Sequence, residues 1–355
     1  MAGGVSEPDE ANVLLANSLK TVLKSKLFGP AHTESRTAWR SLVDTLGAAE
    51  RLYVSPAKGF GLGPRRHAEA EVAEGLRYVA HVIRLSFELF LESDPIESPR
   101  FVRFVSPHLK MLGDNPDAYY FISQVDPSAS YLVSGCRTEV YFSLSVHAEQ
   151  RPGEAFQRVV ADVNDASLKR DNGGCWQLLL SAGSAPPTSL PEGATWLGLP
   201  STSATVVTRH YFETNPPAQL SQKISNGIRL SIQRWGDAEP TAAHEQSASD
   251  VRMARSLAAV DKFVRDHTVN MPLPDPSTAP PFFSLEPNVI GKPMKWKGED
   301  QGMGAVDIAY GAGRFLLKPG HGLVIRGRIP KCRFANVVLW NRYAGIAVDL
   351  RSRRG

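Results

Sequence analysis

Two carboxylates stand close together in the segment GDNPDAYYF, residues 113–121. Asp114 and Asp117 are three residues apart and directly precede a run of aromatic residues. A pair of carboxyl groups at such a spacing can act as general acid and general base. The same residues also suit a turn, because Pro116 fixes φ and Asp and Asn side chains accept hydrogen bonds from nearby backbone amides. Asp114 and Asp117 are therefore the candidate catalytic residues, and a structural turn is the alternative interpretation.

Aromatic and basic residues in strand-like segments supply candidates for ligand binding. Arginines suit an anionic substrate, because a guanidinium group binds carboxylate and phosphate with paired hydrogen bonds. The candidate binding residues are Tyr119, Tyr120, Arg137, Arg209, Tyr211 and Arg342. If the first and last strands share a sheet, these residues converge with the two aspartates on a pocket at one end of it. A scattered arrangement would exclude this hypothesis, and the sequence leaves open whether the protein is an enzyme.

The sequence contains no recognisable metal or nucleophile motif. It has neither a CxxC pair nor HExxH, and G-x-S-x-G is absent. The glycine-rich stretch 59–67 lacks the Walker lysine and the full dinucleotide spacing, so it predicts a flexible segment before a helix. Asp162, Asn164 and Asp165 suit a turn better than a calcium loop, because the twelve-residue ligand pattern is missing. We therefore predict no metal and no cofactor.

Composition restricts the partners and the location. The 355 residues carry a net charge of +4, from 40 basic and 36 acidic residues, which is too balanced to indicate nucleic-acid binding. No apolar run approaches the ~18 residues of a membrane span, and the start lacks the order of a signal peptide. The three cysteines are far apart and odd in number. A disulfide framework is therefore not expected, a reducing cytoplasm is, and Cys136 is interpreted as a small core residue.

Residues 1–95 form a predicted N-terminal helical region. Helical periodicity occurs at 11–28, at 35–52, where Ser35 would be the N-cap, and most clearly at 67–94. In the last of these, apolar residues recur every three to four positions until Pro95 ends the pattern.

The composition of residues 96–355 predicts a second, mainly β region. Short segments rich in β-branched and aromatic residues are separated by Gly, Pro, Asn and Asp, which is typical of antiparallel strands in a sandwich or barrel. The predicted strand segments are 118–125, 130–146, 157–163, 175–182, 195–199, 204–213, 227–235 and 313–343. One helix near 249–268 interrupts them, and a proline-rich arm at 270–293 follows it.

Several of these segments together resemble the DUF1214 domain, a family named for its unknown function. The opening FVRFVSPHLKMLGDNPDAYYFISQVDPSASYLVSGCR, the strand VTRHYF and the segment 304–343 carry the resemblance, which covers roughly residues 65–350. It implies a jelly-roll-like β-sandwich, similar in architecture to viral capsid subunits, and brings no catalytic residues. No DUF1254 domain, which often accompanies the family, is visible here. Family members continue beyond the strand ending at Tyr343, so we expect an open sheet edge or strands supplied by another chain.

The sequence thus predicts a mainly β protein, an antiparallel jelly-roll-like β-sandwich with an N-terminal helical region and one inserted helix. Two functions remain open. The first is the binding or conversion of a small molecule in a pocket at one end of the sandwich. The alternative is a non-catalytic assembly protein with a capsid-like jelly roll, in which the proline-rich arm and the open edge supply the contacts of a homo-oligomer. Neither nucleic acid nor membrane is a predicted partner.

Overall fold

The computed structural model describes most of the chain from residue 33 onward. The described residues are 33–55, 68–106, 109–136, 139–149, 151, 153–154, 158–213, 228–236, 250–271, 279–295, 305–328, 330–341 and 343. Several sequence predictions lie outside them: the helix at 11–28, the glycine-rich stretch 59–67, and the candidate binding residues Arg137 and Arg342.

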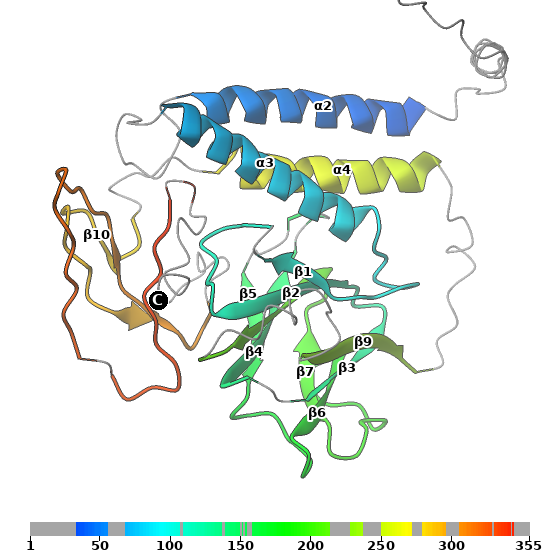
Figure 1. Ribbon diagram of the computed structural model, residues 1–355. Helices are drawn as coiled ribbons and strands as arrows, with labels where there is room; N and C mark the ends of the chain where they lie inside the picture. Colours follow the sequence, from blue (N-terminus) through cyan, green and yellow to red (C-terminus); the bar gives the residue numbers. More distant parts are fainter. Residues whose placement is uncertain are drawn as a thin grey trace, which may run out of the picture.

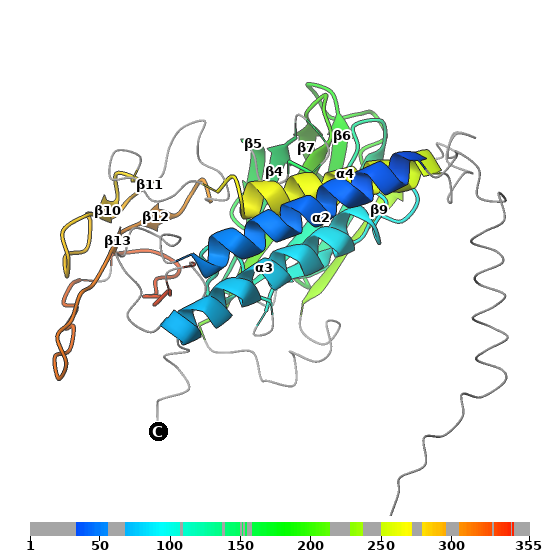
Figure 2. The same ribbon diagram turned by 90° about the horizontal axis from the view of Figure 1, so that it is seen from above.

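Three helices form one layer of the molecule. They are α2 (Thr33–Val54), α3 (Ala68–Phe90) and α4 (Asp250–His267), and they contact one another along their lengths. Seen from above, they lie side by side over the strands (Figure 2). All three helices were predicted from apolar periodicity, and the structure confirms them. Ser35 does not cap α2, which begins at Thr33; its hydroxyl instead donates to Asp250 at the start of α4.

Two sheets form the other layers. The five-stranded sheet has the order β1 (Val102–Val105), β2 (Ala118–Val125), β8 (Ala204–Tyr211), β4 (Tyr141–Ala148) and β5 (Val159–Asn164), all antiparallel. The four-stranded sheet has the order β7 (Thr195–Leu199), β6 (Cys175–Ala182), β3 (Ser130–Cys136) and β9 (Arg229–Trp235). Only the β6–β7 pair of this sheet is parallel. The predicted class, mainly β with antiparallel sheets, N-terminal helices and one inserted helix, is confirmed.

The five-stranded sheet lies between two hydrophobic cores, because side chains alternate between its faces. Tyr120, Val207 and Tyr211 face the helices and join one core. Phe142 and Val206 face the four-stranded sheet and join the other. The layers therefore follow the order helices, five-stranded sheet, four-stranded sheet (Figure 1). The central strand β8 is buried at every position.

The chain beyond α4 does not form the strands that the sequence predicts at 313–343. Its described strands are four two-residue segments in two small sheets: β10 (Phe283–Ser284) with β13 (Ala312–Gly313), and β11 (Met294–Lys295) with β12 (Ala309–Tyr310). The last strands, expected at 321–348, were predicted to share a sheet with the first ones. Among the described residues of that segment none belongs to a strand of the five-stranded sheet, so for these residues the prediction is wrong. Pro319, Gly320, Gly322 and Pro330 interrupt the apolar runs there, and Pro cannot donate to a strand ladder.

A disulfide joins Cys136 to Cys175, which overturns the expectation that these cysteines are reduced. The two residues are directly opposite on the antiparallel strands β3 and β6, a pairing that their separation of 39 residues hides in the sequence. Cys136 is only half-buried, so it is not the core residue that the sequence suggested, and Cys332 is a free, exposed thiol. The cytoplasmic location loses the support of the cysteine count and stays a prediction. Among the described helices, none is long and apolar enough to cross a bilayer.

Candidate functional site

Asp114 and Asp117 lie in a tightly held turn before β2. Asp114 is 2% exposed, and its Oδ2 accepts a bond of 3.2 Å from Lys110 Nζ. The backbone amide of Asp117 donates to Asn115 Oδ1 at 2.9 Å, which is the side-chain-to-backbone bond typical of Asx turns. The structure therefore supports the turn interpretation for both carboxylates.

A distant part of the chain docks on this turn. Trp340 Nε1 donates to the backbone oxygen of Asp114 at 2.8 Å, and Asn336 Nδ2 donates to Asp117 Oδ2 at 2.7 Å. The Trp340 ring also covers Gly113, where a Cβ would lie 3.3 Å from it. The turn and residues 334–340 thus converge without forming a shared sheet.

Tyr119 does not join the other candidate binding residues. Its ring lies 4.2 Å from the Arg103 guanidinium and 5.5 Å from the Phe212 ring. Neighbouring residues of a strand point to opposite faces, so Tyr119 faces away from Tyr120. We therefore place Tyr119 outside the site that Tyr120 helps to form.

Tyr120, Arg209 and Tyr211 do come together, on the helix-facing side of the five-stranded sheet. Tyr120 and Arg209 are directly opposite on β2 and β8, and the Tyr120 and Tyr211 rings are 6.4 Å apart. Arg209 is 4% exposed, and its Nη1 donates to Ser145 Oγ on β4 at 2.9 Å. Three of the eight predicted site residues therefore share one location.

Further polar residues, which were not among the predicted site residues, complete this location. The rings of Tyr141 and Tyr211 are 5.8 Å apart and tilted against each other. The Tyr141 hydroxyl donates to Asp307, which also accepts from Asn164 Nδ2 at 2.9 Å. Tyr310 accepts a bond of 3.0 Å from the backbone amide of Ala305. We call this set the tyrosine–arginine cluster: Tyr120, Tyr141, Ser145, Arg209, Tyr211, Asp307 and Tyr310.

The electrostatics of the cluster favour neutral phenols beside one buried cation. Burial raises the pKa of Tyr211 to about 12 and raises the pKa values of Tyr120 and Tyr310 as well, while the charge of Arg209 partly opposes each shift. Burial and then the bond to Asp307 raise the pKa of Tyr141. The phenols therefore keep their protons at neutral pH. Together with Arg209 they offer hydrogen-bond donors and positive charge, and Asp307 offers an acceptor.

A second polar group continues along the same face of the sheet toward α4. Ser145 Oγ lies 3.1 Å from His147 Nε2, so Ser145 links His147 to Arg209. Glu149 follows β4 and is 2% exposed, and its Oε1 has no hydrogen-bond partner among the described residues. Burial, and then the nearby charge of Glu154, raise the pKa of Glu149 to about 8. This carboxyl group therefore keeps its proton at neutral pH and titrates at about pH 8.

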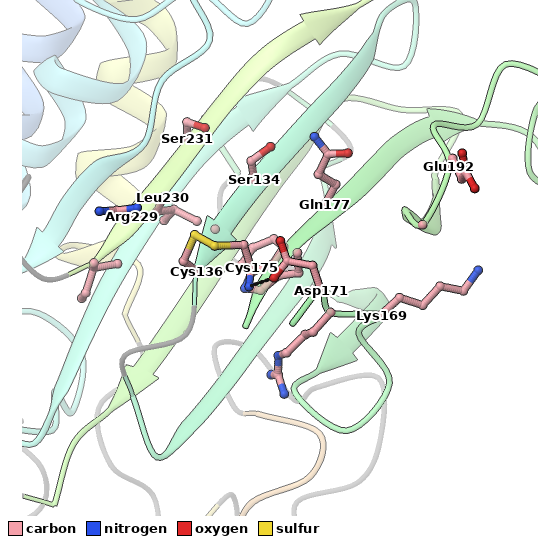
Figure 3. Close-up of a pocket in the computed structure, with 15 residues that line it drawn as sticks. Ser134, Cys136, Lys169, Asp171, Cys175, Gln177, Glu192, Arg229, Leu230 and Ser231 are labelled. Atoms are coloured by element: carbon pink, nitrogen blue, oxygen red, sulfur yellow. Dashed lines mark hydrogen bonds between the residues drawn. A yellow bond between two sulfur atoms is a disulfide. The ribbon is translucent and has the colours of Figure 1, made fainter. Parts of the chain in front are cut away.

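The outer face of the four-stranded sheet carries a groove with a volume of about 1020 Å³. Residues of β3, β6 and β9 form its floor, and the loops at 169–171 and 192–193 contribute to its wall. The Cys136–Cys175 disulfide lies in the middle of it (Figure 3). Sequence analysis missed this groove, because its residues come together only through the pairing of β3 with both β6 and β9.

Comparison with known proteins finds similarity in structure alone. No family model and no curated protein sequence matches the chain. The crystal structure of an uncharacterised protein from Burkholderia cenocepacia is similar, with a TM-score of 0.52 and 19% identity over 66% of this chain and 59% of that one. The VPA0106 protein from Vibrio parahaemolyticus aligns with a TM-score of 0.28 and 11% identity, over 62% of this chain and 50% of that one. The chain thus shares a fold with the Burkholderia protein and spans about three-fifths of its length.

Proposed function

We propose that the protein binds a small molecule carrying a carboxylate or phosphate group at the tyrosine–arginine cluster. The observation that carries this proposal is Arg209, whose charge is buried among hydroxyl groups on a central strand. Removing a guanidinium from water is costly, and a charge kept in such a place is a candidate for function. The convergence of Tyr120 and Tyr211 on it supports the same conclusion.

Each group of the cluster has a part in this binding. The guanidinium of Arg209 binds the anionic oxygens, for which its planar geometry is suited. The neutral phenols donate further hydrogen bonds, and Asp307 accepts from a hydroxyl or amine of the ligand. A catalytic role for Asp114 and Asp117 remains a prediction, and the contacts with Asn336 and Trp340 favour a positioning role for that turn.

A thermal-shift measurement with inorganic phosphate and a panel of mono- and dicarboxylates tests the proposal. A ligand that binds only the folded state at about 100 times its Kd stabilises the protein by roughly 2.7 kcal/mol, so at least one anion is expected to raise Tm. Arg209→Gln is expected to abolish this rise, and Tyr211→Phe to reduce it. Arg103→Gln is the matched control, because Arg103 stacks on Tyr119 outside the cluster. A panel with no active anion, or an undiminished response in Arg209→Gln, would contradict the proposal.

A second candidate function, self-assembly, is favoured by exposed apolar side chains in the region beyond α4. The consecutive residues Leu323, Val324 and Ile325 are all exposed, Val324 by 73%, and Val337 is 62% exposed. Contiguous exposed apolar surface is typical of interaction sites. The other large apolar residues that are exposed among the described residues of this region are Leu285, Val289, Ile290, Met294, Val306, Phe315, Leu316 and Trp340. The resemblance to DUF1214, which implies a capsid-like jelly roll, supports this candidate by analogy alone.

Light scattering coupled to size-exclusion chromatography tests the assembly candidate. If copies associate through this surface, the wild-type mass exceeds that of one 38.7 kDa chain and rises with concentration. Val324→Asp is expected to shift the protein toward the monomer, because a carboxylate is costly to bury at an interface. Glu192→Gln, on the four-stranded sheet side, serves as the control. A monomeric wild type at all concentrations would contradict the assembly candidate and leave the binding proposal unaffected.

A further inference from the structure

The disulfide is placed where a dissolved thiol can reach it. Cys136 and Cys175 are both half-buried, and both line the groove on the outer face of the four-stranded sheet. The strands that carry them are already held together by a continuous ladder from Tyr131–Leu180 to Cys136–Cys175. Opening the S–S bond therefore leaves the pairing of β3 with β6 in place.

Charged side chains flank the disulfide on both sides. Arg229 is directly opposite Cys136 on β9, and Lys169 lies on the other side of the groove (Figure 3). Both side chains are exposed, and neither makes an ion pair within the described part of the chain. Arg170 adds a third cation, although it lies 4.0 Å from Asp165. The described lining of the groove thus carries three basic residues against two acidic ones, Asp171 and Glu192.

Of the two carboxylates that line the groove, one lies beside the disulfide and the other lies away from it. Asp171 Oδ1 accepts hydrogen bonds of 2.8 Å from the backbone amides of Gly173 and Cys175. Glu192 lies on the wall away from the disulfide (Figure 3). A thiolate at Cys175 would therefore form beside a carboxylate, whereas a thiolate at Cys136 would form beside Arg229. A neighbouring cation favours the thiolate and a neighbouring anion disfavours it.

We propose that this groove binds low-molecular-weight thiols that carry carboxylate groups and exchanges them with the Cys136–Cys175 disulfide. The carboxylates of the ligand bind Arg229 and Lys169. Side chains of Ser134, Gln177 and Ser231, which form a row across three neighbouring strands, bind its amide groups. The activity is independent of the tyrosine–arginine cluster, which lies on the helix-facing side of the five-stranded sheet.

The exchange balances in two steps. The thiolate of the ligand attacks Sγ of Cys175, a mixed disulfide forms, and the electron pair of the broken S–S bond leaves on Sγ of Cys136 beside Arg229. A second ligand thiolate then attacks the ligand sulfur of the mixed disulfide. The products are a ligand disulfide, which is the oxidised form of the two thiols, and the reduced pair Cys136 and Cys175, which takes up the two protons.

The rate of disulfide opening with two thiols of different charge tests the proposal. Reduced glutathione and uncharged 2-mercaptoethanol are each added to a Cys332→Ser protein, which removes the free thiol. Mass spectrometry after alkylation counts the opened disulfides and the mixed disulfide on Cys175. Each rate is divided by that for the same protein unfolded in urea, which removes differences in intrinsic reactivity. The normalised rate for glutathione is expected to exceed that for 2-mercaptoethanol by about tenfold or more. Added salt is expected to reduce this difference.

Charge variants separate recognition from simple accessibility. Lys169→Gln is expected to remove part of the glutathione advantage while leaving the 2-mercaptoethanol rate unchanged. Arg229→Gln is expected to slow both thiols, because it also removes the cation beside the leaving Cys136 thiolate, and to slow glutathione more. Arg158→Gln is the matched control, because Arg158 is exposed and does not line the groove. A disulfide that opens only on unfolding would show a purely structural bond and overturn the proposal. Equal normalised rates for the two thiols would overturn it as well, since the groove would then select no anion.

Discussion

Replacing Glu149 with Gln is expected to stabilise the protein at pH 9 and to change its stability little at pH 4. The folded state raises the pKa of Glu149 from 4.5 to about 8, so between these values the folded protein keeps a proton that the unfolded chain releases. The wild type therefore loses stability as pH rises through this window, and the loss is complete above pH 8. At 1.36 kcal/mol for each pKa unit, the full effect reaches at most about 5 kcal/mol. Gln fills the same buried space and has no proton to lose, so no charge develops there at high pH.

Urea unfolding of wild type and variant at a series of pH values measures this difference. The two curves of unfolding free energy should meet in acid and diverge steadily above pH 5. The protonation of His267, whose pKa burial lowers to about 4, destabilises both proteins equally in acid and cancels in the difference. Glu192→Gln, the same substitution at an exposed position, serves as the control. Parallel profiles for wild type and Glu149→Gln would show that Glu149 does not carry the effect.

Removing the disulfide is expected to cost about 4 kcal/mol of unfolding free energy. A bond that closes a loop of this length restricts the unfolded chain, and a separation of 39 residues corresponds to that amount in the chain-entropy description. The Cys136→Ser, Cys175→Ser double variant is expected to remain folded, because the ladder between β3 and β6 does not depend on the bond.

The contribution of the disulfide to the unfolding free energy can be measured in two ways, by reducing the bond and by replacing both cysteines. Wild type in excess reductant and the double variant should unfold at the same urea concentration, below that of the oxidised wild type. Cys332→Ser should match the wild type under both conditions, since Cys332 forms no disulfide. If the oxidised wild type and the double variant unfolded together, the bond would contribute nothing to stability.

Most of the helices and strands were predictable because each carries its own local pattern. The exceptions are β1, which was not predicted, and the single segment 130–146, which forms the two strands β3 and β4. Strands β2, β6 and β7 coincide residue for residue with the segments predicted at 118–125, 175–182 and 195–199. In α3 and α4 the apolar residues recur every three to four positions because one face of each helix packs into the core, so the sequence alone predicts both helices. The segment 313–343 shows the limit of this approach. Its apolar residues have the composition of strands, yet among the described residues only Gly313, at its start, belongs to a strand.

The site was less predictable, because its residues meet only through strand register. Tyr120 and Arg209 were identified from their residue types, but the contribution of Tyr141 depends on its position opposite Tyr211 on β4. Asp307 reaches the cluster from outside either sheet, and its own neighbours in sequence give no hint of this. The disulfide has the same origin, since Cys136 and Cys175 are brought together by a ladder that begins five residues earlier. Long-range pairing is the information that a single sequence does not display.

The position of β8 has a consequence for the order in which the chain folds. This strand lies between β2 and β4, although more than fifty residues separate it from either of them along the chain. Until residue 211 has left the ribosome, β2 and β4 lack the neighbour that each needs, and both keep a bare edge. The core between the helices and the five-stranded sheet can form only later, after α4 has been synthesised. We therefore expect slow folding dominated by distant contacts, with nascent chains that require protection from aggregation until α4 is made.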